Sequence, residues 1–294
     1  MLYSPLRYPG GKGKLAPFMG LMINKMNIEK GTYIEPFAGG AGVALMLLME
    51  GYVDDIVIND YDKAIYSVWR AIIDESENLV DRILYTPVNI DEWKKQKEIY
   101  VEQNKRYSLD LAFATFFLNR TNRSGILKGG PIGGFEQTGN YAIDARYNAE
   151  KLVERIRAIA KYKKHIKVYN KEIVSFIEKI LPNYDQNSLT YFDPPYFNKG
   201  PELYKNFFST EDHAKIAQLI LNEVPGKWII TYDDTPEIIG LYKQQCIRRY
   251  DLNYSAANTG KSSEVIVFND NKFCPTNQEL LNQKININLR EVNE

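Results

Sequence analysis

Short apolar runs alternate with stretches of helical pattern along most of this chain, and this alternation limits the folds that it can adopt. Runs of four to eight apolar residues, separated by helical stretches, are typical of a parallel sheet covered by helices. The predicted strands are residues 32–35, 56–60, 166–169, 189–192 and 228–232, and the predicted helices are residues 43–49, 63–73, 151–161, 171–180 and 211–221. We therefore predict an α/β protein.

The last two apolar runs, residues 247–252 and 265–268, differ from the others in their connection. Residues 253–264 leave no room for a crossover helix, so these strands must be antiparallel. The predicted sheet is mostly parallel with an antiparallel edge hairpin.

Residues 76–148 break the alternation, because they are charged and largely helical around a glycine-rich stretch at 124–134. We interpret this region as an insertion. The predicted domains are a discontinuous α/β domain of residues 1–70 and 149–275, an inserted, mainly helical subdomain of residues 71–148, and a polar C-terminal tail of residues 276–294 with a short helix and a loose end.

Charge is balanced overall but separated along the 294 residues, with 37 Lys and Arg against 37 Asp and Glu. Residues 50–92 hold eleven acids and three bases, whereas residues 94–130 hold eight bases and three acids. Residues 151–171 add eight bases against one acid. The balance excludes a uniformly basic surface, and the basic stretches are either solvated helical faces or one wall of a groove for phosphates.

Several classes of protein are excluded by what the sequence lacks. No uncharged apolar run approaches the roughly 20 residues of a membrane span, and the first residues lack the apolar core of a signal peptide. With two histidines and two distant cysteines, the chain is poorly supplied for a zinc site or a histidine-based triad. We expect a cytoplasmic protein with no bound metal and no membrane partner.

A glycine cluster follows the first predicted strand and precedes a helix. Gly39, Gly40 and Gly42 would let backbone N–H groups approach a ligand at the helix N-terminus, although a tight turn without a ligand gives the same pattern. Leu45 stands where the dinucleotide fingerprint requires its third glycine. Asp60, at the end of the second strand, is placed to accept hydrogen bonds from ribose hydroxyls. Together these residues indicate a cofactor that contains a nucleoside.

The N-terminal sequence Gly10-Gly11-Lys12-Gly13-Lys14 has only a superficial likeness to a phosphate-binding P-loop. That motif would need a glycine at Tyr8 and a hydroxyl at Leu15, and no strand precedes it. A nucleoside triphosphatase is therefore disfavoured.

The most specific stretch is an apolar strand that ends in Asp193-Pro194-Pro195-Tyr196. Ligands bind at such strand ends in open α/β sheets. The Asp193 side chain and the Pro194 carbonyl offer two acceptors for an amino group, and the Tyr196 ring can stack on a planar base. A strand end turned by two prolines, with no ligand, would look similar in outline.

With these motifs in place, the sequence resembles the N6-adenine DNA methyltransferases of the DNA adenine methylase type, in their alpha arrangement. The resemblance extends from Tyr8 to about Asn269. The segments that carry it are Tyr8-Pro9-Gly10-Gly11-Lys12, Glu35-Pro36-Phe37-Ala38-Gly39-Gly40, Asn59-Asp60, Leu118-Asn119-Arg120, Asp193-Pro194-Pro195-Tyr196 and Ser263-Glu264-Val265-Ile266-Val267-Phe268-Asn269.

The resemblance implies a Rossmann-like fold that binds S-adenosylmethionine, with the inserted subdomain recognising the DNA target. It implies catalytic roles for Asp193, Pro194, Pro195 and Tyr196. The implied cofactor-binding residues are Tyr8, Gly10, Gly11, Lys12, Glu35, Pro36, Phe37, Ala38, Gly39, Gly40, Asp60, Glu172, Ile173 and Asp193. The family often has Asp-Phe where Glu172-Ile173 stands, beside the adenine of the cofactor.

The implied reaction is a direct, in-line transfer of a methyl group to N6 of an adenine flipped out of double-stranded DNA. Hydrogen bonds from N6 to Asp193 and to the Pro194 carbonyl would favour a tetrahedral nitrogen and offset its developing positive charge. The proton can leave after transfer, so no histidine is required. Stacking on Tyr196 would offset part of the cost of flipping the base.

The DNA contacts are expected in the basic stretch, on a glycine-containing hairpin with Arg120, Asn122, Arg123, Ser124 and Lys128. Lys128 stands where an arginine is common, and Arg123-Ser124 where Tyr-Asn often stands, so the recognised sequence GATC is not carried over. We expect a prokaryotic or phage enzyme, a monomer or weak dimer, with a restriction endonuclease acting on the same site as a further partner.

Other functions remain open at this stage. The same transfer could act on cytosine N4, on RNA adenine or on a glutamine side chain, although those relatives more often carry Ser or Asn in place of Asp193. A catalytically silent DNA-binding module would be expected to lose Asp193 or Lys12, and both are present. A NAD-linked oxidoreductase is disfavoured by the missing third glycine.

Overall fold

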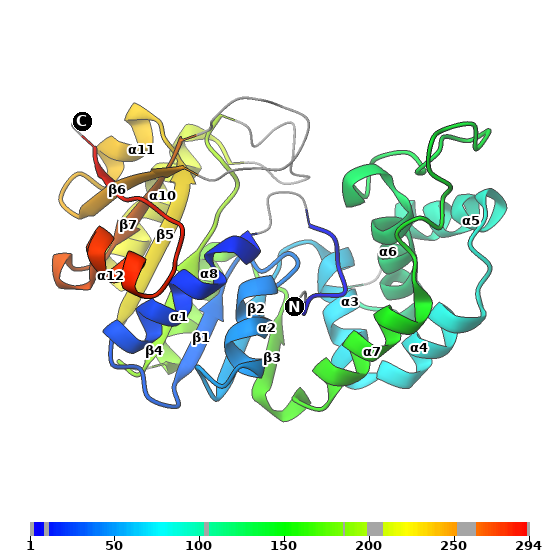
Figure 1. The fold of residues 1–294 in the computed structure, drawn as a ribbon, viewed down its shortest axis with the longest axis horizontal. Coiled ribbons are helices and arrows are strands. Elements are labelled where there is room, and N and C mark those ends of the chain that lie inside the picture. The colour runs from blue at the N-terminus through cyan, green and yellow to red at the C-terminus, as the bar shows by residue number, and fades with distance from the viewer. Residues whose placement is uncertain are drawn as a thin grey trace. The chain divides into compact units, whose positions relative to one another are not determined.

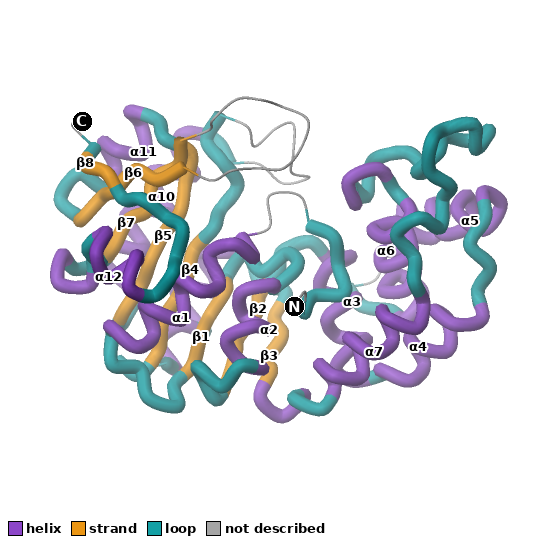
Figure 2. The backbone as a smooth tube through the Cα atoms, viewed as in Figure 1, coloured by secondary structure: helices purple, strands orange, loops and turns teal. Residues whose placement is uncertain are grey.

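The predicted alternation of strands and helices is confirmed in a computed structural model that describes residues 3–8, 12–102, 106–184, 186–198, 208–251 and 263–292. The strands are β1 (Thr32–Glu35), β2 (Asp55–Asn59), β3 (Ile166–Tyr169), β4 (Ser188–Phe192), β5 (Lys227–Asp233), β6 (Cys246–Asp251), β7 (Ser263–Phe268) and β8 (Arg290–Glu291). Their hydrogen-bonded order is β3-β2-β1-β4-β5-β7-β6-β8 (Figure 2).

The helices follow the predicted pattern with shifted ends. They are α1 (Ala16–Lys25), α2 (Gly42–Met49), α3 (Lys63–Asp74), α4 (Ser76–Tyr85), α5 (Ile90–Val101), α6 (Leu109–Thr121), α7 (Ala149–Ala160), α8 (Ile173–Lys179), α10 (Thr210–Glu223), α11 (Pro236–Leu241) and α12 (Asn277–Asn282). Short 3-10 helices are Lys12–Leu15, Arg123–Gly125, Lys163–His165, Leu181–Asn183 and Asn271–Phe273. The sequence did not predict α1, which is apolar on most sides, or the short α11. Within the described ranges, no helix combines the length and the apolar character needed to span a membrane.

The strand directions confirm a mostly parallel sheet with an antiparallel end. β1, β4 and β5 are parallel, and β7 is antiparallel to both β5 and β6. The last long strand, β7, is not at the edge, because it lies between β5 and β6. Beyond β6, the tail adds β8, which pairs Arg248 with Glu291. The tail therefore has the predicted short helix, and its residues 290–291 join the sheet, whereas the end predicted to be loose, residues 293–294, lies outside the described residues.

The chain divides into two compact units. The helical unit comprises residues 1–13, 38–46 and 57–170, and the sheet unit comprises residues 14–37, 47–56 and 171–294. Both are discontinuous, and the chain passes from one to the other between Phe37 and Ala38. The assignment of residues 1–70 with 149–275, of 71–148 and of 276–294 to separate functional domains stays a prediction.

The helical unit is built around α6, which packs against α3, α4 and α5 (Figure 1). Its sequence is apolar on nearly all sides, so the helix is buried almost throughout. The helix begins after Ser108, whose hydroxyl accepts a hydrogen bond from the Leu111 N–H. α7 completes the unit by packing against α3 and α4.

In the sheet unit, α1 and α10 cover opposite faces of the sheet. The ring of Phe18 in α1 lies 6.4 Å from that of Phe268 in β7. On β5, Ile229 pairs with Phe268 and therefore points to the same face, whereas Tyr232 points to the other. The Tyr232 ring meets His213 of α10 at 5.5 Å. Every residue of β4 is buried between the two layers.

Gly31 fixes the start of β1, the strand that leads to the glycine turn. Its carbonyl accepts hydrogen bonds from Asp54 N–H and Asp55 N–H, at 3.1 and 3.3 Å. The neighbouring Thr32 N–H donates to the Asn187 carbonyl at 3.1 Å. A Cβ atom at Gly31 would lie 2.1 Å from the Asn187 carbonyl oxygen, which is backbone and cannot move aside.

We predict that Gly31→Ala lowers the free energy of unfolding by roughly 1–3 kcal/mol, as overpacking does. Urea denaturation gives this value directly. The matched control is Gly240→Ala in α11, where an added Cβ has nothing within 4 Å. Because alanine favours a helix over glycine, the control should gain about 0.5–1 kcal/mol. Equal urea midpoints for Gly31→Ala and Gly240→Ala would contradict the conclusion that Gly31 has no room for a Cβ atom.

Candidate active site

In the sheet unit, β1 ends in a buried carboxylate and a short aromatic contact. Glu35 is 5% exposed and follows Tyr33 by two residues, on the same face of the strand. Burial and the nearby Glu35 charge hold the Tyr33 pKa well above its ordinary value. After Pro36, the Phe37 ring meets the Phe208 ring edge-on at 6.0 Å. Glu35, Pro36 and Phe37 thus lie where β1 ends, as the sequence predicts.

In the helical unit, the glycine turn is held by hydrogen bonds to its backbone. The Ala38 N–H donates to the Asn59 carbonyl, and the Gly39 N–H donates to Oδ2 of Asp60, both at 2.9 Å. Trp69 Nε1 donates to the Gly39 carbonyl at 2.9 Å. Gly39 has φ +46°, a conformation that favours glycine. Asp60 therefore orients the turn as well as ending β2.

The Tyr8 ring lies against this turn. A Cβ atom at Gly39 would be 2.7 Å from Cε1 of Tyr8, and one at Gly40 would be 3.1 Å from Cβ of Tyr8. The structure therefore brings together the predicted residues Tyr8, Gly39, Gly40 and Asp60. Lys12 is buried at the start of a 3-10 helix. Gly10 and Gly11 lie outside the described residues.

Burial makes Asp60 an unusual carboxylate. Burial and the nearby charge of Asp62 together raise the pKa of Asp60 to about 7. Two backbone donors oppose the shift, because the N–H groups of Asp62 and Gly39 each bind one oxygen at 2.9 Å. Near neutral pH, a ligand that donates hydrogen bonds to Asp60 would therefore shift its protonation.

Glu172 and Ile173, predicted beside the cofactor adenine, have structural contacts in the sheet unit. The Glu172 carboxylate accepts hydrogen bonds from the N–H groups of Val174 at 3.0 Å and Ser175 at 3.3 Å, and so caps α8. Ile173 is buried. In the helical unit, Asn170 donates to the carbonyls of Asp60 and Tyr61, at 2.8 and 2.9 Å. A cofactor contact of Glu172 or Ile173 stays a prediction.

In the sheet unit, two hydroxyls in series, those of Tyr191 and Thr231, donate toward Asp193. Thr231 Oγ1 donates to Oδ1 of Asp193 at 2.9 Å, and the Tyr191 hydroxyl lies 2.7 Å from the same Oγ1. A threonine hydroxyl has one proton, so Tyr191 must be the donor to Thr231. Burial and the Asp193 charge hold the Tyr191 pKa well above its ordinary value, which keeps that proton in place. The chain of donors suits an ionised Asp193, which only accepts.

A second carboxylate fixes Tyr196. The Tyr196 hydroxyl donates to Oε1 of Glu264 at 2.5 Å, and the Tyr250 hydroxyl donates to Oε2 at 2.6 Å. Glu264 is 1% exposed on β7. The Tyr196 hydroxyl is thus bound to Glu264 of β7, which is also bound by Tyr250 of β6. The Tyr196 backbone follows β4 through Asp193, Pro194 and Pro195.

The period of two in the strands explains why these groups meet. Thr231 and Asp233 are two residues apart on β5, and Asp233 pairs with Glu264 of β7, which pairs with Tyr250 of β6. Paired residues and residues two apart share one face of a sheet. Thr231, Glu264 and Tyr250 therefore belong to the polar network around Asp193 and Tyr196, and the sequence analysis assigned them no role. Their signal in the sequence is a polar residue at alternate positions of an apolar strand.

The chain after Tyr196 is held by Asp233 of β5 and packs against His213 of α10. The N–H groups of Phe197 and Asn198 donate to the two oxygens of Asp233, at 2.8 and 2.9 Å. The Phe197 ring lies 5.2 Å from His213, whose Nδ1 is 2.8 Å from the Tyr232 hydroxyl. Burial lowers the His213 pKa, so the ring is neutral at physiological pH. His213 packs beneath this segment.

The predicted DNA-binding loop lies in the helical unit and is closed by an antiparallel bridge between Asn122 and Pro131. Asn122 is fully buried, with its side chain bound to Trp93 Nε1 at 2.7 Å and to the Ile126 carbonyl at 2.8 Å. This placement favours a structural role, so a DNA contact of Asn122 stays a prediction that its burial does not support. Exposed residues of the loop include Arg123, Ser124 and Lys128, whereas Arg120 is half-buried.

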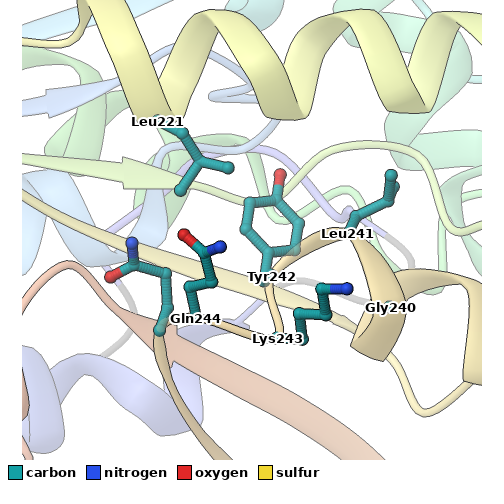
Figure 3. A pocket seen from close by; sticks show the side chains of 7 residues that line it. Leu221, Gly240, Leu241, Tyr242, Lys243 and Gln244 are labelled. Atoms are coloured by element: carbon teal, nitrogen blue, oxygen red, sulfur yellow. The ribbon is translucent and has the colours of Figure 1, made fainter.

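A pocket elsewhere in the sheet unit is not part of this site (Figure 3). It is lined by Leu221 of α10 and by residues 240–245. β6 begins directly after it, at Cys246, and runs parallel to β5 because both are antiparallel to β7. The pocket is therefore at the amino ends of the strands, whereas Asp193 follows the carboxyl end of β4.

The parallel strands, the glycine turn with Asp60, and the Asp-Pro-Pro-Tyr strand end define an amino-group methyltransferase of the α/β class. Residues 8–256 match the family of D12 class N6 adenine-specific DNA methyltransferases. The chain belongs to this family, and it is an enzyme that methylates adenine in DNA.

Known relatives are distant. The type II methyltransferase M.MjaIII of Methanocaldococcus jannaschii is 24% identical over 236 residues, which cover 72% of this chain and 77% of the relative. Among solved structures, the rRNA methyltransferase AviRa of Streptomyces viridochromogenes has a TM-score of 0.36 and 13% identity, with 83% of this chain and 79% of that chain covered. Spermidine synthase of Thermotoga maritima has a TM-score of 0.36 and 9% identity, with 90% and 65% covered.

We predict that Thr231→Val lowers kcat for methyl transfer by about 10- to 100-fold, because a hydrogen bond to a charged group contributes about 1.5–3 kcal/mol. Tyr191→Phe should have a smaller effect, since Thr231 keeps its proton for Asp193. Steady-state kinetics on a DNA substrate measure both. Thr231→Ser is the control, because it retains the hydroxyl. An active Thr231→Val variant, with kcat unchanged, would show that Asp193 does not need this donor.

Proposed function

We propose that the enzyme transfers a methyl group from S-adenosylmethionine to N6 of an adenine that is flipped out of double-stranded DNA at specific sites. The observation that carries this proposal is the bonding of Asp193. Two hydroxyls in series, Tyr191 and Thr231, are arranged to donate toward it. A carboxylate that is kept as an acceptor suits a substrate group with N–H donors, such as an amino group.

The residues of the helical unit fit the nucleoside part of this cofactor. Asp60 is a half-buried acceptor at a strand end, the position in which such folds bind ribose hydroxyls. At Gly42, the first residue of α2, an added Cβ would have nothing within 4 Å, so there is open space at this helix N-terminus. Tyr8 and Lys12 would border the remainder. When bound, S-adenosylmethionine would supply a methyl group activated by its sulfonium.

Asp193 would orient the substrate nitrogen and offset its charge. A carboxylate has about four acceptor positions, so a bond from Thr231 to Oδ1 leaves capacity for a bond from N6. Together with the Pro194 carbonyl, Asp193 would hold the N6 hydrogens so that the nitrogen lone pair is directed out of the ring plane. The positive charge that develops on nitrogen would then lie beside a carboxylate, and a proton could leave after transfer.

Tyr196 would hold the flipped base by stacking. Its hydroxyl is bound to Glu264, so the ring is positioned before a base arrives. Stacking on such a ring contributes about 1–3 kcal/mol per base, which offsets part of the cost of flipping. Base identity would come from contacts at the base edge, since stacking does not distinguish bases.

The reaction and its sequence context can be tested together. Expression in cells without endogenous DNA methylation, followed by sequencing that detects modified bases, should show N6-methyladenine at one recurring site. Methylated cytosine N4 instead would contradict the adenine assignment. A partner endonuclease and the oligomeric state stay predictions.

We predict that Asp193→Ala reduces methyl transfer by at least about 100-fold, as expected when a preorganised polar partner of the reacting atom is lost. Isothermal titration should show that S-adenosylmethionine still binds. Asp193→Asn is the sharper control, because its oxygen can still accept from Thr231 while its NH₂ group would face the substrate amino group, donor against donor. Transfer at the wild-type rate in either variant would refute the mechanism.

Cofactor affinity should depend on pH through Asp60. Its pKa is raised in the folded protein, so its contribution to the free energy of unfolding is present at low pH and is lost as pH rises through about 7. Ribose hydroxyls prefer the ionised form. The dissociation constant should therefore fall by about tenfold between about pH 6 and about pH 8.

Two variants at the end of β2 separate this effect from others. Asp60→Asn should bind the cofactor more weakly and without the pH dependence. Asp62→Asn keeps a residue that can cap α3 but removes a charge that raises the Asp60 pKa, so the midpoint should move to lower pH. If the dissociation constant has the same pH profile in the wild type, Asp60→Asn and Asp62→Asn, Asp60 does not bind the ribose.

A further inference from the structure

Four arginines of the helical unit come together from separate segments of the chain. They are Arg7 before the first helix, Arg120 in the last turn of α6, Arg146 before α7, and Arg155 within α7. Arg120 Nε donates to the Arg146 carbonyl at 2.8 Å, and Arg7 Nη1 donates to the Asn122 carbonyl at 3.0 Å. Arg155 Nη1 donates to the Ser4 carbonyl at 3.3 Å.

The four positive charges repel one another. Burial and the charges of Arg7, Arg155 and Arg146, in that order of size, together lower the Arg120 pKa to about 10. The Arg7 pKa is lowered by burial and by Arg146. Among the described residues, no carboxylate is named as a cause of either shift. We call these four residues the arginine cluster.

Other arginines of the same unit have acidic partners. Arg157, one half-turn from Arg155 on α7, forms a two-pronged contact with Glu77, with Nη2 at 2.6 Å from Oε2. Arg82 of α4 pairs with Asp110 at 2.7 Å. In the part of the chain that the structure describes, no member of the arginine cluster forms such an ion pair.

Arg7, Arg120 and Arg155 are half-buried. Such guanidinium groups without a counter-charge cost free energy, and a bound anion would offset that cost. Each of these hydrogen bonds uses one N–H of a guanidinium, which has five, and the planar fork of those that remain matches phosphate oxygens. Arg7 also binds the carbonyl of Asn122, at the start of the loop predicted to contact DNA. A row of phosphates can neutralise several arginines, whereas one carboxylate of a cofactor cannot.

We propose that Arg7, Arg120, Arg146 and Arg155 bind backbone phosphates of the DNA substrate beside the loop formed by residues 122–131. This inference rests on the proposed function for its choice of double-stranded DNA, and it assigns the phosphate contacts to residues mostly outside that loop. The cluster contributes affinity and register but not sequence preference, because phosphates are the same at every base pair.

The test measures DNA affinity against salt concentration for Arg146→Gln and Arg155→Gln, with a fluorescent duplex that contains the methylated site and an unrelated duplex of equal length. Arg146 is exposed, so its replacement leaves the core intact. Each variant should weaken binding several-fold on both duplexes. The slope of log affinity against log salt should become shallower by about 0.9 per lost phosphate contact.

Three controls make the result specific. Arg157→Gln removes an arginine from the same helix that is already paired with Glu77, so it should leave the slope unchanged. Arg146→Lys should retain most of the slope because it retains the charge. Without DNA, Arg146→Gln and Arg155→Gln should melt no lower than the wild type, since relief of repulsion opposes any lost contact; a lower melting temperature with an unchanged slope would indicate a structural role and overturn the proposal.

The outcomes also separate this inference from the proposed function. Unchanged slopes in an enzyme that methylates DNA would overturn the arginine cluster alone. A loss of S-adenosylmethionine affinity, with DNA binding intact, would assign the cluster to the cofactor carboxylate and overturn it as well. Reduced slopes in a protein that binds duplex DNA without methylating it would support the cluster and contradict the proposed reaction.

Discussion

The Thr231 hydroxyl has a single proton, and it uses this proton to donate a hydrogen bond to Asp193. This interaction depends on most of the sheet unit. Thr231 is presented by β5 in register with β4, Tyr191 completes the chain of donors, and α1 covers the same face so that water does not compete. A buried polar network is stable only when each member has a partner. The fold therefore fixes the position of the carboxylate that is proposed to receive the substrate amino group.

The sequence predicted the parts of this site that depend on local pattern. Asp193 and Tyr196 belong to one four-residue motif at the end of a strand, and the glycine turn follows shortly after β1. The neighbouring residues along the chain therefore identify both features. Thr231 and Glu264 could not be found in this way, because they are polar residues in ordinary apolar strands and gain meaning only from register. Asn122 shows a different limit. It stands in a basic, glycine-rich loop, and its DNA contact stays a prediction, but the sequence does not reveal that Trp93, 29 residues earlier, binds its side chain in the interior.

The charge distribution also has one part that the sequence shows and one part that only the fold shows. The net charge of zero and the basic stretch at residues 94–130 are visible in the sequence. The grouping of Arg7 with Arg155 is not, since 151 residues separate Ser4 from the guanidinium that binds its carbonyl. Charge counting over windows therefore predicts the proposed DNA-binding region only coarsely. The fold concentrates positive charge from separate segments into one cluster, while nearby arginines such as Arg157 are neutralised by acids.

Asn119 has a consequence for how this chain is made and handled. Its buried amide binds both backbone groups of Arg7, at 2.7 Å each, and also the Gly125 carbonyl at 3.1 Å. During synthesis, the segment around Arg7 must therefore wait for residue 119, 112 positions later, before it can dock. A tag fused ahead of Arg7 would act on this late docking step.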